Sequence, residues 1–174
     1  MVARQRTPLQ EVAGERVRLR PYDRADLPAL VRAVNDPAVA AWWGKYDESA
    51  LHDELTDERL MVWTILVDGE PVGVIEVTEE DEPDYRHVSL DIFLSAGLHG
   101  RGLGAEALHI ALRHVFDDRG HHRATIDPAV ENERAIRSYE RVGFKPVGIV
   151  RRAERAPDGR WRDSLLMDLL AEEL

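Results

Sequence analysis

Alternating and helical spacings of apolar residues divide the first third of the chain into short elements. Residues 16–20 alternate polar and apolar side chains, as a half-buried strand does. A helical spacing follows over residues 21–34, and the tripeptide Asn35-Asp36-Pro37 is a stop signal for that helix. Residues 48–60 show a second, weaker helical pattern. The chain is therefore predicted to begin with a strand and two helices.

Two apolar runs in the middle of the chain predict a β-hairpin. They cover residues 61–67 and 70–77 and flank Asp68-Gly69, a dipeptide that favours a two-residue turn. The acidic run 79–84 comes next, and we expect it to be a solvated loop between strands. These residues would start a meander of antiparallel strands.

Residues 87–94 predict a strand with two unlike faces, because the side chains of a strand alternate between the faces of its sheet. One face would carry Val88, Leu90, Ile92 and Leu94, and the other would carry His87, Ser89, Asp91 and Phe93. Asp91 is thus a charged residue inside a strand. Such a residue is unfavourable there unless it has a partner or a task.

A glycine-rich turn, His99-Gly100-Arg101-Gly102-Leu103-Gly104, joins this strand to a strongly amphipathic helix that starts at residue 103 and closes near Gly120. Glycine lets the backbone approach an anion, and the first N–H groups of a helix lack partners, so the turn predicts a pyrophosphate site. The sequence has neither the Gly-Lys-Ser/Thr of a P-loop nor the G-x-G-x-x-G of a dinucleotide fold. An ordinary tight turn is the alternative.

The rest of the pattern is strand, helix, strand, strand, over residues 123–127, 131–142, 144–152 and 161–169. Gly143 stands where the end of the helix needs a positive φ angle. Pro157-Asp158-Gly159 predicts the turn between the last two strands. The chain has no repeat, low-complexity tract or linker, so we expect one domain over residues 1–174, in the α/β class.

Composition narrows the function. A chain of 174 residues with 44% hydrophobic residues suits one enzyme domain. It has no cysteine, which excludes a cysteine nucleophile, and its histidines lack the spacing of a metal-binding helix, so we expect no metal. No apolar run reaches the ~18 residues of a membrane span. Residues 1–10 lack the apolar core of a signal peptide, which indicates a cytoplasmic location without membrane partners.

The formal charge of −10 opposes nucleic-acid binding and favours a cationic partner. An acidic surface also serves solubility by itself. The charge therefore bears on function only beside a site.

A second motif lies one strand after the glycine turn and reads Asn132-x-x-Ala135-x-x-x-Tyr139-x-x-x-Gly143-Phe144. Together the two motifs resemble the GCN5-related N-acetyltransferase (GNAT) family, and the predicted element order βααβββαβαββ is similar to that of the family. The resemblance implies the GNAT fold, a mixed central sheet of about seven strands with splayed central strands, flanked by about four helices.

The resemblance also implies acetyl-CoA as co-substrate, with its pyrophosphate on the glycine turn and its pantetheine beside the preceding strand. His99 departs from the family, which usually has Gln or Arg there, but backbone amides at 101–105 do not depend on that side chain. The implied cofactor-binding residues are Ile92, Phe93, Leu94, His99, Gly100, Arg101, Gly102, Leu103, Gly104, Ala105, Asn132 and Tyr139.

A narrower likeness is to the aminoglycoside 6′-N-acetyltransferases. It is carried by Trp42-Trp43-Gly44, Asp68-Gly69-Glu70-Pro71, Leu90-Asp91, Gly102-Leu103-Gly104, Asp127-Pro128 and residues 132–144. The likeness implies Asp91 and Asp127 as acceptor-side carboxylates and Tyr139 as the acid beside the thiol, and Asp158 is a fainter match in the substrate site. The tryptophan pair would line a substrate cleft.

Each of these roles has a plainer alternative. Asp127 before Pro128 also suits an Asx turn, the ring of Tyr139 suits core packing, and the Trp42-Trp43 pair suits an aromatic plug between helices. A carboxylate beside an amine can take its proton, and a phenol can protonate a departing thiolate. The charged residues of helix 131–142 are expected to form a solvated face with i,i+4 pairs.

The sequence therefore favours an N-acetyltransferase that moves an acetyl group from acetyl-CoA directly to a primary amine of a small cationic molecule, with an aminoglycoside 6′-amine as the leading acceptor. A polyamine, a siderophore precursor or a protein N-terminus is the alternative acceptor. A CoA-binding module without turnover is the alternative of another class. Monomer and homodimer both stay open.

Overall fold

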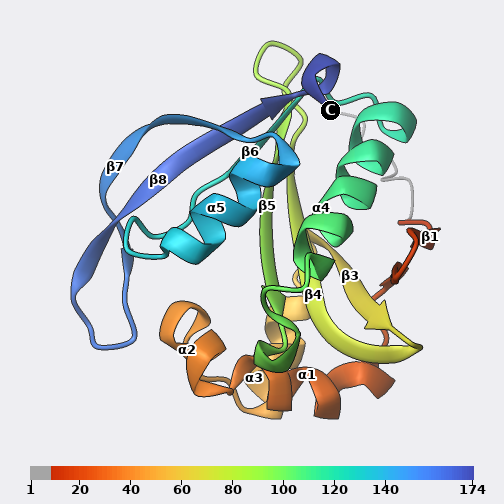
Figure 1. Ribbon diagram of the computed structural model, residues 1–174, viewed down its shortest axis with the longest axis vertical. Coiled ribbons are helices and arrows are strands. Elements are labelled where there is room, and N and C mark those ends of the chain that lie inside the picture. Colours follow the sequence, from red (N-terminus) through yellow and green to blue (C-terminus); the bar gives the residue numbers. More distant parts are fainter. Residues whose placement is uncertain (1–8) are drawn as a thin grey trace.

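One mixed sheet of eight strands runs through the computed structural model, which describes residues 9–174 (Figure 1). Its order is β1-β2-β3-β4-β5-β6-β8-β7, and every neighbouring pair is antiparallel except β5 and β6, which are parallel. The strands are β1 (Val12–Ala13), β2 (Val17–Pro21), β3 (Leu60–Val67), β4 (Glu70–Glu80), β5 (His87–Leu94), β6 (Arg123–Ile126), β7 (Lys145–Arg155) and β8 (Trp161–Leu170).

Helices cover both faces of the sheet. Within residues 9–174 the α-helices are α1 (Leu27–Val34), α2 (Pro37–Trp43), α3 (Glu48–Leu55), α4 (Leu103–Arg113) and α5 (Glu133–Val142). None of the helices in this part of the chain is long and apolar enough to cross a membrane. The first residues, 1–8, where the sequence lacks a signal-peptide core, lie outside the described residues.

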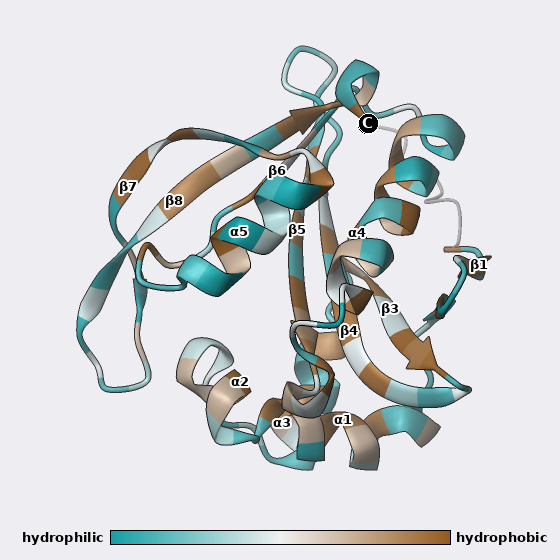
Figure 2. Cartoon of the chain, viewed as in Figure 1, coloured by the Kyte–Doolittle hydropathy of each residue, from teal (hydrophilic) through white to brown (hydrophobic). Residues whose placement is uncertain are grey.

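The two faces of β5 pack against different helices, as the sequence predicts. Leu90 belongs to the larger core cluster, which includes Leu108 of α4 and Tyr139 of α5. Phe93 belongs to the second cluster, with Leu30 of α1 and Leu51 of α3. In Figure 2 β5 is mostly hydrophobic and α5 is largely hydrophilic along its length. Asp91 therefore lies on the α1–α3 face of the sheet, whereas α4 and α5 cover the other face.

The strands β5 and β6 pair over only a short stretch and then separate. They pair only at Val88–Ala124 and Ser89–Thr125, although β5 continues to Leu94. The missing pairs leave one edge of β5 open, and this edge lies between the two helical layers. The α/β class and the splayed central strands expected from the sequence are confirmed.

Two small elements were not predicted. The two-residue strand β1 pairs with β2 and raises the strand number to eight. The tripeptide Asn35-Asp36-Pro37 ends α1 as expected, but it also starts α2, since Pro37 occupies the first turn and the Asp36 side chain accepts a hydrogen bond from Ala38 N at 2.9 Å. A single signal thus both stops one helix and caps the next.

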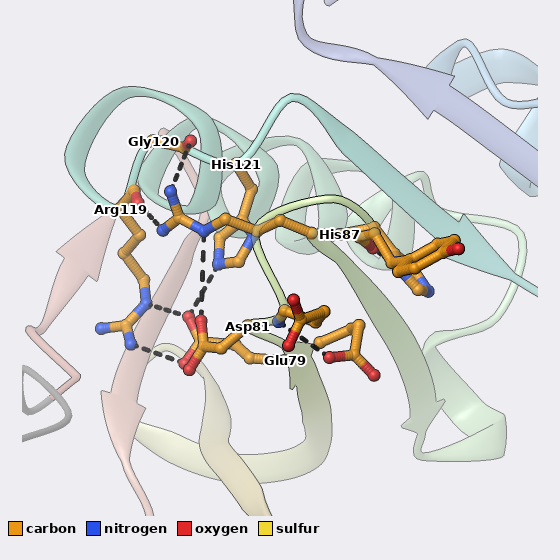
Figure 3. A network of polar contacts seen from close by, with 10 residues as sticks. Glu79, Asp81, His87, Arg119, Gly120 and His121 are labelled. Carbon is orange, nitrogen blue, oxygen red and sulfur yellow. Dashed lines mark hydrogen bonds and ion pairs between the residues drawn. The ribbon is translucent and has the colours of Figure 1, made fainter. Parts of the chain in front are cut away.

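The expectation that residues 79–84 are all solvated loop is wrong for Glu79 and Glu80, because β4 continues to Glu80. Figure 3 shows the Arg119 guanidinium and the His121 ring meeting the Glu79 carboxylate. Arg119 Nε and His121 Nε2 both lie 2.8 Å from Glu79 Oε1. Burial acts to raise the pKa of Glu79, but these two hydrogen bonds outweigh it and lower the pKa to about 2.

Ligand atoms of Glu79, Asp81 and His121 lie within 4.8 Å of one another, which is a spacing that suits a metal ion. Two arginines already stand among them, however, because Arg119 binds both oxygens of Glu79 and Arg86 Nε lies 4.0 Å from Asp81. These positive charges occupy the place of a cation. The cluster therefore serves to fasten β4 to the segment that leads into β6.

Candidate functional site

A cleft of about 480 Å³ opens at the edge where β5 and β6 separate. Its walls come from α2, the glycine turn, the start of α4, and α5. All the site residues predicted from the sequence line this cleft except Arg101 and Asp158. Asp158 lies in the turn between β7 and β8, where it pairs with Arg160 at 2.7 Å. The structure therefore brings the predicted cofactor-binding residues of the glycine turn together with the predicted catalytic residues Asp91, Asp127 and Tyr139.

The glycine turn presents backbone N–H groups to the cleft. Gly100 and Gly102 have φ angles of 76° and 79°, a left-handed conformation that favours glycine. Gly102 caps α4 without a side-chain hydrogen bond, so no cap side chain occupies the first N–H groups of the helix. Leu103, Gly104 and Ala105 line the cleft at this point. The positive end of the helix dipole and these amides suit a phosphate group.

Glu106, the acidic residue in the first turn of α4, is turned away from this anion site. Its carboxylate binds the Arg16 side chain at 2.9 Å and also accepts hydrogen bonds from the backbone N–H groups of Arg16 and Val17. Arg16 Nη1 in turn donates to the carbonyl of Arg101 at 3.0 Å. The start of β2 thereby neutralises Glu106 and supports the turn from behind.

His99 connects the end of β5 to α5. Its Nε2 lies 2.7 Å from the carbonyl oxygen of Leu94, and its Nδ1 contacts Nη1 of Arg134. Burial lowers the pKa of His99. A neutral ring that donates from Nε2 and accepts at Nδ1 fits both contacts. This histidine therefore holds the turn in place by its side chain, while its backbone lies in the cleft wall.

The open edge of β5 carries backbone N–H donors. Ser95 N donates to Val72 O at 2.7 Å on the β4 side, and N–H groups alternate between the two edges of a strand. By this alternation the N–H groups of Ile92 and Leu94 point to the edge that β6 has left. Ile92 N donates to Asp91 Oδ1 at 3.1 Å. The Leu94 amide is thus placed to polarise a carbonyl in the cleft.

Asp91 and Glu76 form a carboxylate pair in the cleft wall. Together with Glu54 they make up what we call the acidic end of the cleft. They are directly opposed across β5 and β4, which places side chains about 5 Å apart on one face of the sheet. Glu76 is only 7% exposed, and its Oε1 has no hydrogen-bond partner within residues 9–174. Glu54 of α3 also lines this end. The sequence singled out Asp91 but missed Glu76, although both are charged residues inside strands.

Burial and nearby negative charges raise the pKa values of this pair. Burial raises the pKa of Glu76 from its usual 4.5 to about 8, and the charges of Asp91 and Glu54 add to the effect. Asp91 is exposed on the wall of the cleft, and desolvation by the protein around it raises its pKa to about 7, with further repulsion from Asp127, Glu154 and Glu54. Near neutral pH the pair therefore carries less than two full charges.

We expect Glu76→Gln to change the pH dependence of stability. Because the folded-state pKa of Glu76 is raised to about 8, the wild-type chain loses stability as pH rises from about 4.5 through 8. The variant lacks this loss, so the two should be equally stable at pH 5 and the variant more stable at pH 9. Urea unfolding at both pH values measures this, and a difference that does not vary with pH would contradict it.

Asp127 and Glu154 supply negative charge on the β6 side. Asp127 follows the end of β6, and burial together with the charge of Glu154 raises its pKa. Glu154 of β7 pairs with Arg162 of β8 at 2.7 Å. Arg162 also donates to the carbonyl of Trp42 at 2.8 Å. The β7–β8 hairpin is thereby attached to the end of α2.

The two tryptophans form part of the cleft wall. Trp42 lies under the Arg162 guanidinium at 5.3 Å from its ring centroid, and Trp43 makes an edge contact with Phe93 at 4.9 Å. Both side chains are half-buried. The pair therefore acts partly as packing and partly as a surface that a ligand can reach.

Tyr139 and Asn132 reach the cleft from α5. Asn132 Oδ1 accepts a hydrogen bond from Ala135 N at 3.2 Å and caps the helix. The ring of Tyr139 packs edge-on against Phe144, with ring centroids 6.2 Å apart. Burial raises the pKa of Tyr139, so the phenol keeps its proton. The side chain of Tyr139 therefore belongs to the core and also lines the cleft.

Comparisons with known proteins agree with this geometry. The family described as acetyltransferase (GNAT) domain matches residues 16–145. The chain is 27% identical to the aminoglycoside N(6′)-acetyltransferase type 1 of Klebsiella pneumoniae, over 84% of this chain and 81% of that protein. It is also 27% identical to the spermidine N(1)-acetyltransferase of Escherichia coli K12, over 87% and 84% of the two chains.

Among solved structures, the chain resembles RimJ of Mycobacterium smegmatis in complex with CoA-disulfide. The TM-score is 0.79 and the sequence identity 27%, over 91% of this chain and 83% of RimJ. The matched residues 16–145 contain the glycine turn, β5 and α5. This chain is therefore an acetyltransferase and belongs to the GNAT family.

Proposed function

We propose that residues 1–174 form one acetyl-CoA-dependent N-acetyltransferase domain whose acceptor is a primary amine of a small polycation, with an aminoglycoside 6′-amine as the leading acceptor. The main support for this proposal is the distribution of charge in the cleft. The carboxylates of Glu54, Glu76, Asp91, Asp127 and Glu154 line the same cleft as the helix N-terminus of α4. An anionic donor and a cationic acceptor each have a complementary surface there.

The relatives support both halves of the proposal. The Klebsiella pneumoniae and Escherichia coli enzymes are named for an aminoglycoside and for spermidine, which are both molecules with several amino groups. RimJ binds CoA-disulfide. Spermidine is the second candidate acceptor, because the relative named for it is as similar to this chain as the one named for an aminoglycoside.

The backbone N–H groups at the start of α4 fit the pyrophosphate of acetyl-CoA, since no side chain caps them. Acetyl-CoA supplies the activated acetyl group as a thioester. In the proposed reaction Asp91 takes a proton from the acceptor ammonium, and the amine nitrogen forms a bond to the acetyl carbon as the C–S bond breaks. Tyr139 gives its phenolic proton to the departing sulfur, the new amide nitrogen loses its second proton to water, and that water returns a proton to Tyr139, while Asp91 releases its proton to solvent. The Leu94 amide stabilises the carbonyl oxygen.

Asp91 suits the role of base better than Glu76 for two reasons. Asp91 opens onto the cleft, whereas Glu76 is 7% exposed. The pKa of Asp91 is raised to about 7, which leaves it partly ionised at neutral pH, while the pKa of Glu76 is raised to about 8. A base with a pKa near the working pH transfers protons efficiently. Glu76 is then mainly protonated and carries little charge near neutral pH.

A thiol-release assay with acetyl-CoA tests the proposed function. The acceptors are kanamycin, tobramycin, spermidine, hydroxylysine and an N-terminal peptide, each with a control that lacks the acceptor. Turnover with the polycations and little with the other two supports the proposal. Turnover confined to the peptide would contradict it, and so would tight acetyl-CoA binding without turnover on any acceptor.

Salt provides a separate prediction about recognition. The KM for kanamycin should rise severalfold between 50 mM and 500 mM NaCl, because ions screen the attraction between several carboxylates and a polycation. The KM for hydroxylysine, with less positive charge, should rise less. Initial rates at fixed acetyl-CoA measure both values, and a kanamycin KM that does not respond to salt would count against carboxylate recognition.

A further inference from the structure

Arg162 of β8 joins two segments that lie 120 residues apart in the sequence and both line the cleft, α2 and the β7–β8 hairpin (Figure 1). Its Nη2 donates to the carbonyl of Trp42 at 2.8 Å, and its Nη1 donates to the carbonyl of Ala41 at 3.3 Å. Its Nε donates to Glu154 Oε1 at 2.7 Å. The guanidinium also lies over the Trp42 ring. One side chain therefore fastens α2 to the hairpin.

The helix α2 depends on contacts of this kind, because a helix of seven residues is too short to be stable alone. The last carbonyls of a helix lack partners within it, and a cation near that end interacts favourably with the helix dipole. Arg162 supplies both the hydrogen bonds and the charge at the end of α2. Its side chain is only 10% exposed, so little water competes for these contacts.

The groups that Arg162 holds lie where the acceptor is expected. Trp42 and Glu154 line the same cleft as Asp91 and Asp127. The charge of Glu154 acts on both aspartates, since it contributes to the rise in the pKa of each. A shift of α2 or of the hairpin would therefore move an aromatic surface and a carboxylate away from the acceptor.

We infer that Arg162 is a positioning residue for the acceptor, because it holds the Trp42 ring and the Glu154 carboxylate in the wall that the acceptor contacts. This inference rests on the proposed function and adds a residue that acts through other groups, without touching the reacting atoms. The glycine turn and the start of α4, where acetyl-CoA is expected, do not contact Arg162. The residue should therefore affect the KM for the acceptor and leave that for acetyl-CoA unchanged.

Arg162 also balances the charge of Glu154 in the surroundings of Asp91. The titratable groups that line the cleft with Asp91 are Tyr46, Glu54, Glu76, Asp127, Tyr139 and Glu154, and the cations are His99, Arg162 and the arginines of α5. The carboxylates favour the protonated form of Asp91, and Arg162 offsets part of this effect by its ion pair with Glu154. Loss of the guanidinium should therefore raise the pH at which kcat increases.

Steady-state kinetics with kanamycin and acetyl-CoA from pH 5.5 to 9 test the inference. Arg162→Gln should raise the KM for kanamycin about tenfold, as expected for the loss of charge-assisted hydrogen bonds. It should leave the KM for acetyl-CoA unchanged and move the rise of kcat to higher pH. Arg162→Lys keeps the charge but lacks the planar fork, so it should restore the wild-type pH profile while the KM for kanamycin stays raised severalfold.

Arg160→Gln is the matched control. Arg160 belongs to the same hairpin and pairs with a carboxylate, Asp158, at 2.7 Å, but its side chain is 86% exposed and lies outside the cleft lining. This variant should keep the wild-type KM values and pH profile. A wild-type KM for kanamycin in both Arg162 variants would overturn the inference and leave the proposed function standing. An equal rise in the KM for acetyl-CoA would overturn it as well.

Distances between spin labels test the attachment of α2 without the reaction. The chain has no cysteine, so Ala38→Cys and Arg160→Cys place one label on an exposed position of α2 and one on the hairpin. Double electron–electron resonance should give a narrow distance distribution with Arg162 and a broader one with Arg162→Gln. Identical distributions would overturn the inference. If the distribution broadens but the wild-type chain acetylates no acceptor, the proposed function fails and the acceptor role of Arg162 fails with it.

Discussion

Asp91→Asn is expected to lower kcat for amine acetylation about a hundredfold or more, which is the usual contribution of a positioned general base. The amide keeps the size of the carboxylate and its hydrogen bond with Ile92 N, so the cleft should keep its shape. It cannot take a proton from the acceptor. Because the pKa of Asp91 is raised to about 7, wild-type kcat should also rise with pH through 7, and the variant should lose that rise.

Steady-state rates from pH 5.5 to 9 measure both effects. Asp53→Asn is the control, since Asp53 is an exposed aspartate of α3 outside the cleft lining, and it should leave the rates unchanged. If Asp91→Asn retains wild-type kcat and the same pH profile, Asp91 is not the base. In that case Glu76 and Asp127 become the groups to replace next.

Tyr139→Phe should lower kcat about ten- to a hundredfold with little change in the affinity for CoA. The substitution removes only the hydroxyl and keeps the ring that packs against Phe144, so folding should be preserved. Burial raises the pKa of Tyr139, which keeps the phenol protonated across neutral pH and able to donate to the thiolate. The loss should therefore appear in the transfer step.

Single-turnover measurement with preformed acetyl-CoA complex isolates that step, and titration with CoA checks binding. Tyr85→Phe serves as control because Tyr85 is 74% exposed and lies outside the cleft lining. A single-turnover rate equal to that of the wild type would show that Tyr139 contributes packing alone, as its ring contact would allow.

Local patterns were sufficient to predict the donor side of the cleft. The glycine turn and the start of α4 follow from spacing and from the conformations that glycine allows, both of which are properties of a short segment. The two faces of β5 follow from strict alternation. The predicted residues of this segment, apart from Arg101, line the cleft together.

The acceptor side depended on contacts between distant segments. Glu76 becomes a partner of Asp91 only through the β4–β5 register, which the sequence does not state. Glu79 looked like part of a solvated run because its partners, Arg119 and His121, come some 40 residues later. The arginines of α5 line the cleft, yet they have the same spacing as arginines that face water, so only the neighbouring elements decide between the two.

Mass spectrometry of kanamycin after incubation with the chain and acetyl-CoA tests the central claim most directly. The account predicts that kanamycin gains one acetyl group on a primary amine, and that one CoA thiol appears for each acetyl group transferred. Spermidine in a parallel reaction should be acetylated if the cleft accepts polycations generally. Unmodified kanamycin and spermidine after full incubation, with acetyl-CoA intact and bound, would contradict the assignment of the acidic end to a polycationic acceptor.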